Sequence, residues 1–497
     1  MLTLISLYVC FYSFQFASGS TLAIPPMSAL VIAFESVYDL SLLANTLSDQ
    51  GIDTTLIIPA YAANELYDRM VDVRVLQLPV NADQSMSAEK RALETCSFLY
   101  TSEDIVMKVE KLRPTFTIFP ALRHDGCVLP YAKHFGSIPI IWIKNPDEEL
   151  YVFECTRVAL PLHTSSGIWS RISTSFSRRS IFSTIKNNYF IPVLREVNHF
   201  IRDVNIDLEY HYSNVRLVLW GGDPVLRSDF ASLTELLLVI GCHHCRGAYP
   251  LHENLQKSLV EYKMGIIVAL LDAKFEVMLQ GLAMKISKKK EGQAILWKMK
   301  RNTNITPDNL FFEDNVDRQD IIGYSRTRVV LSHCTDTEFL EAAFHGTPLI
   351  CLPRDAQESR NAARVIELGF GRSVKITNDL IDSAVELTRA LQEIHGTMVF
   401  RENARQVSMA IRDRLNPPSD KLIYWLGYLT RTKDDTKKFH KPNRQARTLR
   451  EDIQFFAGLL VGAVIGIVGT ISVIIVRYLV NRISTNKVQT VKGRYMQ

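Results

Sequence analysis

Four consecutive residues place two thiols and two imidazoles side by side, at Cys242, His243, His244 and Cys245. Thiolates and imidazoles at this spacing are ligands that zinc prefers, and a structural zinc ion needs four of them in a tetrahedral arrangement. Such a site draws its ligands from two Cys/His pairs, and no second pair lies nearby in the sequence. The sequence therefore predicts no metal at this cluster.

The eight cysteines are widely spaced along a chain of 497 residues. Cys10 lies in an N-terminal segment that we expect to be removed, which leaves an odd number. An odd set spread over so long a chain is not typical of a disulfide-stapled scaffold. We therefore predict no disulfide framework among the others, which are Cys96, Cys127, Cys155, Cys242, Cys245, Cys334 and Cys351.

The composition, 47% hydrophobic and 22% charged, is that of a large globular protein and excludes a disordered or collagen-like chain. The net charge of +5 invites a nucleic-acid interpretation. However, the last stretch, 477–497, carries five basic residues and no acidic one, so everything before it is neutral in sum. A neutral body binds polyanions poorly, and we predict no nucleic-acid partner.

Both ends of the chain predict passage through a membrane. Residues 1–20 are apolar and end in small residues, as a secretory signal does. Residues 455–476 carry no charge and are long enough, as a helix, to cross the hydrocarbon core of a bilayer. Basic residues follow this stretch closely, so the positive-inside rule places the tail in the cytosol. We expect a type I membrane protein of the endoplasmic reticulum or secretory pathway, with its main body in the lumen.

Three glycines, Gly458, Gly462 and Gly466, lie four residues apart in the expected span. Small residues at this spacing allow two membrane helices to approach closely, so a homo- or hetero-dimer is one interpretation. The other is that glycine is simply frequent in membrane helices, and both stay open.

Short apolar runs alternate with amphipathic stretches, a pattern typical of βα repeats and parallel sheets. The second half of the chain repeats the organisation of the first after a polar, helical middle at about 165–209. We expect two facing, doubly wound Rossmann-like domains, with ligands bound at the carboxyl ends of the strands. The expected strands are 29–34, 54–59, 73–79, 116–121 and 138–143 in the first half, then 265–271, 294–299, 328–333 and 348–353 in the second.

One continuous run in the second half carries a family resemblance, DNVDRQDIIGYSRTRVVLSHCTDTEFLEAAFHGTPLICLPRDAQESRNAARV at 314–365. It resembles the signature of the UDP-glycosyltransferases, and most of all that of the membrane-bound UDP-glucuronosyltransferases. Supporting stretches are IGCHHCRGAYPLHENL at 240–255, LIYWLGYLTRTK at 422–433 and the first strand and helix at 34–59.

The resemblance implies a GT-B fold divided into a signal at 1–20, an acceptor-side domain at 21–245, a UDP-sugar-side domain at 246–454, a span at 455–476 and a tail at 477–497. It also implies transfer of a glucuronosyl or glucosyl group, with inversion and without a metal or other cofactor, from a UDP-sugar co-substrate to a small lipophilic acceptor.

The family's catalytic pair does not survive in this sequence. In the family a His takes the proton of the acceptor and an Asp orients that His, and these positions fall here on Ser36 and Arg123. A lone hydroxyl is no general base at neutral pH, and a guanidinium cannot orient an imidazole. The neighbouring side chains that remain as substitute candidates are Glu35, His124 and Asp125, which are otherwise loop residues.

The family's donor site is altered as well. Asp272 and Ala273 stand where the family has Gly-Ser beside the diphosphate, so we expect an acid to repel that anion. The uracil-stacking W-x-P-Q becomes 315–318, and the two glycines of H-G-G become Cys334 and Thr335. The resemblance assigns the UDP-sugar to Ala273, Arg318, His333, Thr337, Glu341, Gln357 and Glu358, with Glu341 contacting ribose and Gln357 and Glu358 replacing the sugar-binding D-Q.

Two hypotheses follow. The first is an active UDP-sugar transferase with divergent site residues. The second is a catalytically silent relative that keeps the two-domain shell and the anchor and serves as a binding or partner protein. The combined loss of the base, its orienting Asp, the phosphate glycines and the uracil platform favours weak or absent transfer.

Overall fold

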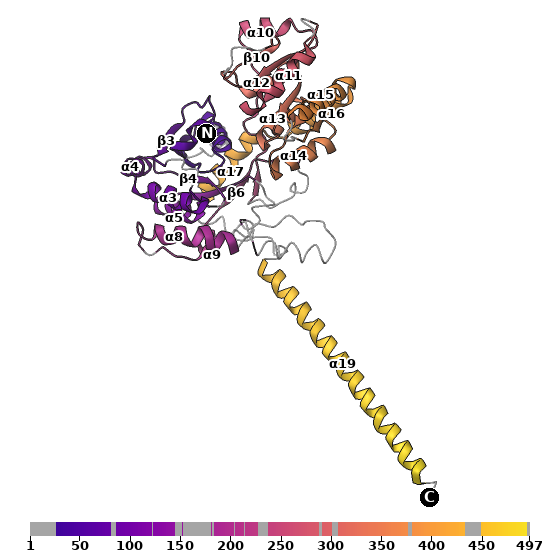
Figure 1. Ribbon diagram of the computed structural model, residues 1–497. Coiled ribbons are helices and arrows are strands. Elements are labelled where there is room, and N and C mark those ends of the chain that lie inside the picture. The colour runs from indigo at the N-terminus through magenta and orange to yellow at the C-terminus, as the bar shows by residue number, and fades with distance from the viewer. Residues whose placement is uncertain are drawn as a thin grey trace, which may run out of the picture.

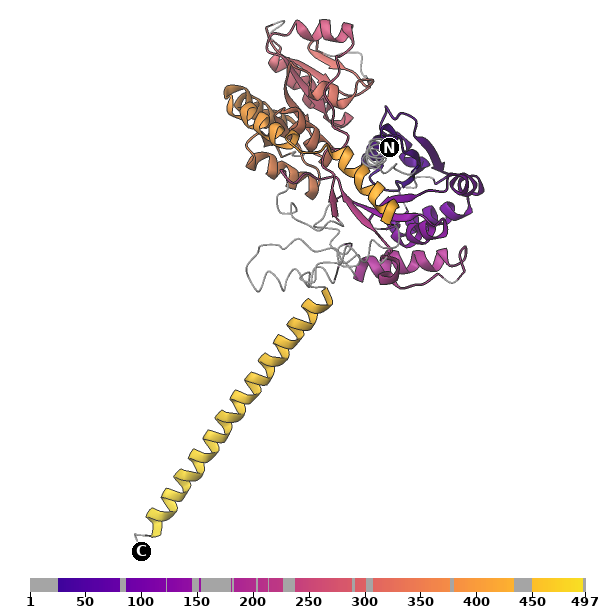
Figure 2. The same ribbon diagram turned by 180° about the vertical axis from the view of Figure 1, so that it is seen from behind.

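The structure, a computed structural model, consists of two α/β domains and a long C-terminal helix that extends away from them (Figures 1 and 2). It describes residues 26–80, 86–121, 123–144, 152, 180, 183–202, 204–212, 214–226, 237–287, 291–300, 307–375, 380–432 and 449–494. The expected signal at 1–20, and also Cys155, lie outside these residues.

The N-terminal domain is built on a parallel sheet whose strand order is β3-β2-β1-β4-β5-β6-β7. Its central strands are continuous apolar runs because both faces of the sheet are covered, as the fully buried FTIFP of β4 illustrates. The strands are β1 (Ser28–Ile32), β2 (Asp53–Pro59), β3 (Arg74–Leu78), β4 (Phe116–Pro120), β5 (Ile138–Ile143), β6 (Leu217–Trp220) and β7 (Leu237–Val239).

Helices connect these strands and cover the sheet. They are α2 (Val37–Asp49), the short η1 (Ala60–Glu65), α3 (Ala88–Thr101), α4 (Glu103–Leu112), α5 (Asp125–His134), η2 (Lys186–Phe190), α8 (Ile191–Val197) and α9 (Leu208–Tyr212). The helices α2, η1, α3 and α5 each follow a strand, and the loop between strand and helix is where a doubly wound sheet presents its functional side chains.

The C-terminal domain has a second parallel sheet, with the strand order β10-β9-β8-β11-β12-β13. Its strands are β8 (Ile266–Leu270), β9 (Ala294–Trp297), β10 (Leu310–Phe312), β11 (Thr327–Ser332), β12 (Leu349–Cys351) and β13 (Gly371–Ser373). Its helices are α10 (Glu253–Val260), η4 (Ala273–Phe275), α11 (Glu276–Ile286), α12 (Arg318–Ile322), α13 (Asp336–His345), α14 (Ala356–Glu367), α15 (Leu380–Gly396) and α16 (Val399–Arg412).

One further helix, α17 (Pro418–Thr432), returns the chain to the N-terminal domain (Figure 1). Its buried Leu422, Leu426 and Leu429 join the core that lies under β1, β2 and α2. A helix of the C-terminal half therefore packs on the first sheet, so the core of the N-terminal domain is completed by residues that follow the second domain.

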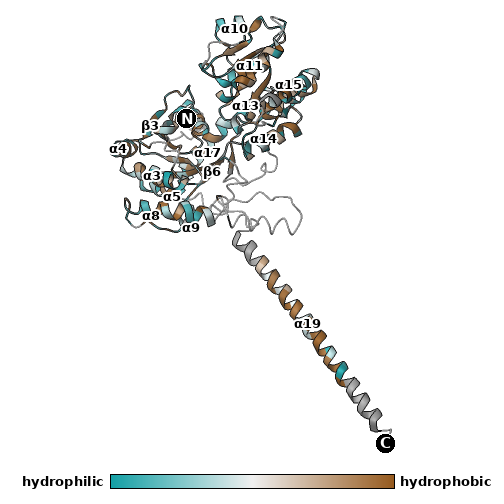
Figure 3. Cartoon of the chain, in the orientation of Figure 1, coloured by the Kyte–Doolittle hydropathy of each residue, from teal (hydrophilic) through white to brown (hydrophobic). Residues whose placement is uncertain are grey.

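The final helix, α19 (Leu449–Arg494), is apolar along much of its length (Figure 3). Its stretch Phe456–Ile483, of mean hydropathy 2.8 and unburied, is long and apolar enough to cross a membrane. It contains the span expected at 455–476 apart from its first residue and extends past Arg477 and Arg482.

Three disulfides contradict the prediction of no disulfide framework: Cys96–Cys127, Cys242–Cys245 and Cys334–Cys351. Two of them join elements that are adjacent in space but separated in sequence, α3 with α5 and the end of β11 with β12. The number of cysteines in the sequence could not show which of them the fold brings close together. The pair within 242–245 is a local bridge, and its two sulfurs are bonded to one another rather than offered to a metal.

The alternating pattern predicted the two-sheet architecture correctly, and each of the nine expected strands is present with both ends within two residues of the prediction. Four strands were not predicted, namely β6, β7, β10 and β13. All four are only three or four residues long and lie toward the edges of their sheets, where a short apolar run is not distinctive.

Candidate functional site

A cavity of about 660 Å³ lies between the two domains at the carboxyl ends of β8, β9 and β11. We call it the interdomain cavity. Four basic and five acidic side chains line it, so it has no excess of positive charge for a diphosphate. The basic ones are Arg69, Lys298, Arg318 and Arg354, and the acidic ones are Asp68, Asp272, Asp314, Asp317 and Glu338.

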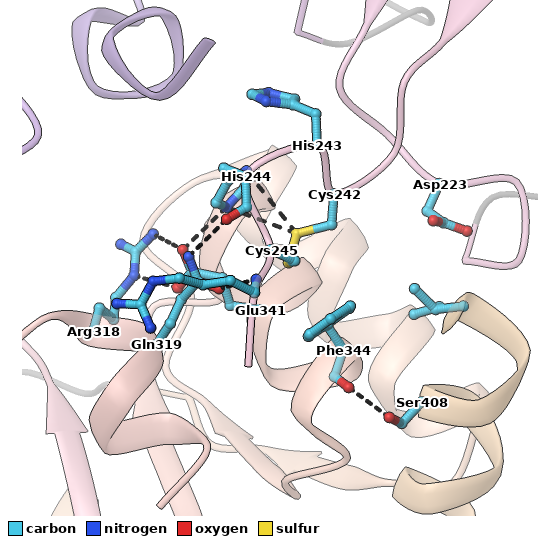
Figure 4. Close-up of a disulfide and its surroundings, with 12 residues drawn as sticks. Asp223, Cys242, His243, His244, Cys245, Arg318, Gln319, Glu341, Phe344 and Ser408 are labelled. Carbon is cyan, nitrogen blue, oxygen red and sulfur yellow. Dashed lines mark hydrogen bonds and ion pairs between the residues drawn. A yellow bond between two sulfur atoms is a disulfide. The ribbon is translucent and has the colours of Figure 1, made fainter. Parts of the chain in front are cut away.

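Glu341, the expected ribose contact, is already occupied by other side chains of the protein (Figure 4). Arg318 donates to both of its carboxylate oxygens, at 2.5 and 2.8 Å, and His244 approaches Oε1 at 3.1 Å. The Glu341 side chain is 1% exposed. Burial, the largest single effect, would raise its pKa, but the charges and hydrogen bonds of Arg318 and His244 together outweigh burial and lower the pKa to about 2. The carboxylate is therefore ionised and fully engaged.

The Cys242–Cys245 bridge lies in the loop that brings His244 to Glu341 (Figure 4). The backbone of this loop is fixed to α12, because Gln319 donates to the His244 carbonyl at 3.1 Å and accepts from the N–H of Arg246 at 3.0 Å. The four residues that resembled a metal cluster thus form a structural turn that supplies one imidazole to the buried carboxylate.

Aromatic side chains of the N-terminal domain cover the same cluster. The Arg318 guanidinium lies 4.7 Å from the ring centre of Tyr38, within the range of a cation–π contact. The Tyr67 hydroxyl donates to Asp317 at 2.6 Å, and burial raises the pKa of Tyr67, so the hydroxyl stays protonated at neutral pH. Tyr38 of α2 and Tyr67, which follows η1, thereby connect the N-terminal domain to the start of α12 directly across the cavity.

The N-terminus of α13 is capped by the protein itself. The N–H of Glu338 donates to Thr335 Oγ1 at 3.4 Å, and the N–H of Thr335 donates to the Glu338 carboxylate at 3.2 Å. This reciprocal capping box satisfies the backbone donors that a phosphate would otherwise use. Cys334 has φ 60°, a backbone conformation that favours glycine, and its sulfur is directed to Cys351.

The acid expected to repel a diphosphate, Asp272, is itself paired. Its Oδ2 lies 3.0 Å from Arg354 Nη1 and 3.4 Å from His333 Nε2. Arg354 also binds Glu358 at 2.6 Å, and Glu358 is 3% exposed. The negative charge of Asp272 is partly compensated, so we expect a weaker repulsion than the sequence alone predicted. Glu358 is engaged in this pairing rather than presented to a sugar.

The remaining donor-side residues are also held by neighbours. Gln357 donates to Asp336 at 2.8 Å, and Thr337 donates across the domain boundary to Asp39 at 3.0 Å. His333 is buried, with Nδ1 at 2.8 Å from the Leu352 carbonyl. Ala273, which is exposed, begins η4 and offers no polar side-chain atom.

A second cavity, of about 220 Å³, lies wholly within the N-terminal domain, and we call it the N-terminal cavity. Glu35 and Arg123 meet there, with Arg123 Nη1 at 2.6 Å from Glu35 Oε1. Arg123 is the position that the sequence assigned to the family's Asp, and Glu35 precedes Ser36, the position that it assigned to the family's His. The walls come from the ends of β1, β2 and β4 and from α3, as Phe34, Glu35, Val37, Tyr61, Ala62, Glu65, Ala88, Arg91, Ala92, Arg123 and His124.

The remaining catalytic candidates, Ser36, His124 and Asp125, are held by other contacts. Ser36 is the left-handed residue before α2 (φ 52°), and its carbonyl accepts from Leu40. Asp125 is fully buried and accepts from the Tyr212 hydroxyl. His124 packs edge-on against Phe34, and burial, aided by the charge of Arg123, lowers its pKa to about 3. His124 is therefore neutral at physiological pH.

Sequence reasoning missed several residues of the site, among them Tyr38, Tyr67, His244, Arg246 and Arg354. Four of them have counterparts across the domain boundary or far away in sequence, so no local spacing could reveal them. Arg354 was the exception, since a basic residue four positions before Glu358 on a helix start indicates an ion pair.

Two facing parallel-sheet domains with a cavity at their strand ends define the class of GT-B glycosyltransferases. Solved structures share the fold. A UDP-glucosyltransferase from Polygonum tinctorium superposes with a TM-score of 0.56 and 13% identity, and the match covers 82% of this chain and 99% of that one. Os79 from O. sativa in complex with UDP superposes with a TM-score of 0.54 and 15% identity, and the match covers 81% of this chain and 100% of that one.

The family model for UDP-glucoronosyl and UDP-glucosyl transferase matches residues 224–489, and the chain belongs to this family. It is 24% identical over 227 residues to UDP-glucuronosyltransferase 2C1 of Oryctolagus cuniculus, which covers 44% of this chain and 42% of the relative. It is also 24% identical over 221 residues to UDP-glucuronosyltransferase 2A2 of Homo sapiens, a match that covers 44% of this chain and 39% of that relative. The chain thus spans about two fifths of the length of the curated relatives it matches.

Proposed function

We propose that this chain is a membrane-anchored UDP-glycosyltransferase-family protein that binds ligands in its cavities but transfers sugar weakly or not at all. One observation carries the proposal: Arg123, which we assign to the position of the family's Asp, is bound to the Glu35 carboxylate, and Ser36, which we assign to the position of the family's His, offers no imidazole. Loss of a general base costs about 10²–10⁴ in rate. The engagement of Glu341 by Arg318 adds a second obstacle, on the donor side.

The proposed setting follows from the anchor. A span within Phe456–Ile483 would hold the two domains at a membrane surface, and the basic residues after it favour a cytosolic tail and a lumenal body in the endoplasmic reticulum or secretory pathway. In this setting the chain would pair with itself or with active relatives. The glycines at 458, 462 and 466 support such pairing, since no side chain fills the space beside them.

A second candidate function is family-type transfer from a UDP-sugar to a small lipophilic acceptor with Glu35 as the base. The favouring observation is that the Glu35 carboxylate lines the N-terminal cavity and is oriented by Arg123. In this case the carboxylate, rather than an imidazole, would take the acceptor's proton.

Turnover separates the two functions. The purified full chain is incubated with UDP-glucose or UDP-glucuronic acid and a panel of lipophilic phenols, and release of UDP is measured. The proposal expects no release above that of a Glu35→Gln variant. Clear release by the unaltered chain that Glu35→Gln abolishes would overturn the proposal and establish the second function.

A further inference from the structure

The disulfides of this chain differ in how completely they are buried. The two bridges that join distant elements, Cys96–Cys127 and Cys334–Cys351, have no exposed surface at either cysteine. In the third bridge Cys242 is 4% exposed, but Cys245 is only partly buried. Of the three bridges in the part of the chain that the structure describes, this one therefore has a cysteine at the protein surface, where a thiol from outside meets it first.

The Cys242–Cys245 bridge also closes the shortest loop. Its cysteines are 3 residues apart in sequence, whereas those of the other two bridges are 31 and 17 apart. A disulfide stabilises the folded state less when the loop that it closes is shorter. Exposed bridges are, in addition, the ones that exchange with other thiols. Opening this bridge therefore costs the fold less than opening either of the others.

An imidazole lies against the buried sulfur of this bridge. The ring nitrogens of His244 are 3.7 and 4.0 Å from Cys242 Sγ (Figure 4). The Glu341 carboxylate, 3.1 Å from Nε2, holds the same ring in place. An imidazole beside a cysteine favours the thiolate, and a sulfur that is stabilised as a thiolate leaves faster in thiol–disulfide exchange. The geometry thus makes Cys242 the leaving sulfur and the more exposed Cys245 the sulfur that is attacked.

Contacts other than the bridge hold this loop in place. Arg246 donates to Asp320 at 2.6 Å and lies 3.3 Å from Asp317. The loop backbone is also bound to the Gln319 side chain at two points. None of these contacts involves a sulfur atom, so they remain when the S–S bond opens. The two thiols then stay close enough to form the bridge again, as a site that works in cycles requires.

We propose that Cys242 and Cys245 form a thiol–disulfide exchange site whose substrate is a dithiol. A thiolate of the dithiol attacks Cys245 Sγ, the S–S bond breaks, and its electron pair leaves on Cys242, where His244 stabilises the thiolate. The second thiol of the dithiol then attacks the mixed disulfide and releases Cys245. The dithiol gives up two electrons and becomes a disulfide, and its two protons end on the two cysteines. This reaction uses neither UDP nor a sugar, so it is independent of the proposed function.

The experiment uses the full chain in detergent, without denaturant, and dithiothreitol as the dithiol. Free thiols are alkylated at successive times and located by peptide mass spectrometry. We expect Cys242 and Cys245 to be reduced at least about ten-fold faster than the two buried bridges, and oxidised glutathione to close the pair again. Equal rates for the three bridges, faster reduction of a buried bridge, or a pair that does not close again would overturn the proposal.

The role of His244 is tested separately. We expect His244→Gln to slow the opening of the bridge by about ten-fold, because the leaving sulfur loses its imidazole. His243→Gln is the matched control, since the His243 ring lies 2.9 Å from Thr46 Oγ1 in the same loop, and it should leave the rate unchanged. Circular dichroism checks the folding of both variants. An unchanged rate in His244→Gln, or the same slowing in both, would overturn the proposed chemistry, while the comparison of the three bridges needs no variant at all.

Discussion

Arg318 and Arg91 each line a cavity of this protein, but only Arg318 is bound directly to a carboxylate among the described residues. Arg318 in the interdomain cavity is bound to the buried Glu341 and covered by Tyr38. Arg91 in the N-terminal cavity has no carboxylate partner among the described residues. A cavity whose polar groups satisfy one another has little to offer a ligand.

The largest expected effect comes from breaking the interdomain pair. Arg318→Ala leaves the Glu341 carboxylate buried beside His244 alone, and we expect a loss of about 3–5 kcal/mol in the free energy of unfolding. Chemical denaturation measures it. The matched control is Arg389→Ala, at an exposed pair, for which we expect less than about 1 kcal/mol. If both variants lost the same free energy of unfolding, the buried Arg318–Glu341 pair would not stabilise the fold.

The second effect concerns pH and the neutral His124. Burial lowers its pKa from 6.5 to about 3, so below pH 6.5 the unfolded chain binds a proton that the folded chain does not. Stability should therefore fall with acidification, by up to about 1.4 kcal/mol per pH unit from about pH 6 to about pH 4. Glu341, whose pKa is lowered to about 2, contributes stability above its unfolded pKa of 4.5 that is lost only at lower pH.

The variant His124→Phe isolates this contribution, because a second ring fits the edge-on packing against Phe34. Denaturation midpoints of both proteins over this pH range should show a flatter dependence for the variant. Parallel curves would contradict a buried, neutral imidazole and with it the assignment of charge in the N-terminal cavity.

The smallest effect concerns the cap of α13. Thr335→Ala removes one half of the capping box and should cost about 1 kcal/mol, whereas Thr335→Ser keeps the hydroxyl and should cost much less. Thermal denaturation compares the two. If Thr335→Ala caused no loss of stability, the Thr335 side chain would not be capping the helix. The backbone donors at this helix end would then be free to bind a phosphate.

The sequence predicted the scaffold better than the site, for a physical reason. Strands such as β4 and β8 are buried on both faces, so each is a run of apolar residues that can be recognised locally. The Arg318–Glu341 pair and the Cys334–Cys351 bridge depend on which elements the fold brings together. Replacement of the family's polar residues was visible in the sequence, but the partners that now hold Glu341 and Asp272 were not.

Titration of the full chain with UDP tests the central claim most directly, namely that the chain's own side chains occupy the nucleotide contacts of the interdomain cavity. We expect no saturable binding below about 1 mM, equivalent to less than about 4 kcal/mol of binding free energy, and no change on Glu341→Ala. Micromolar binding of UDP that Glu341→Ala weakens would contradict the claim, because Glu341 would then be available to the ligand despite Arg318 and His244.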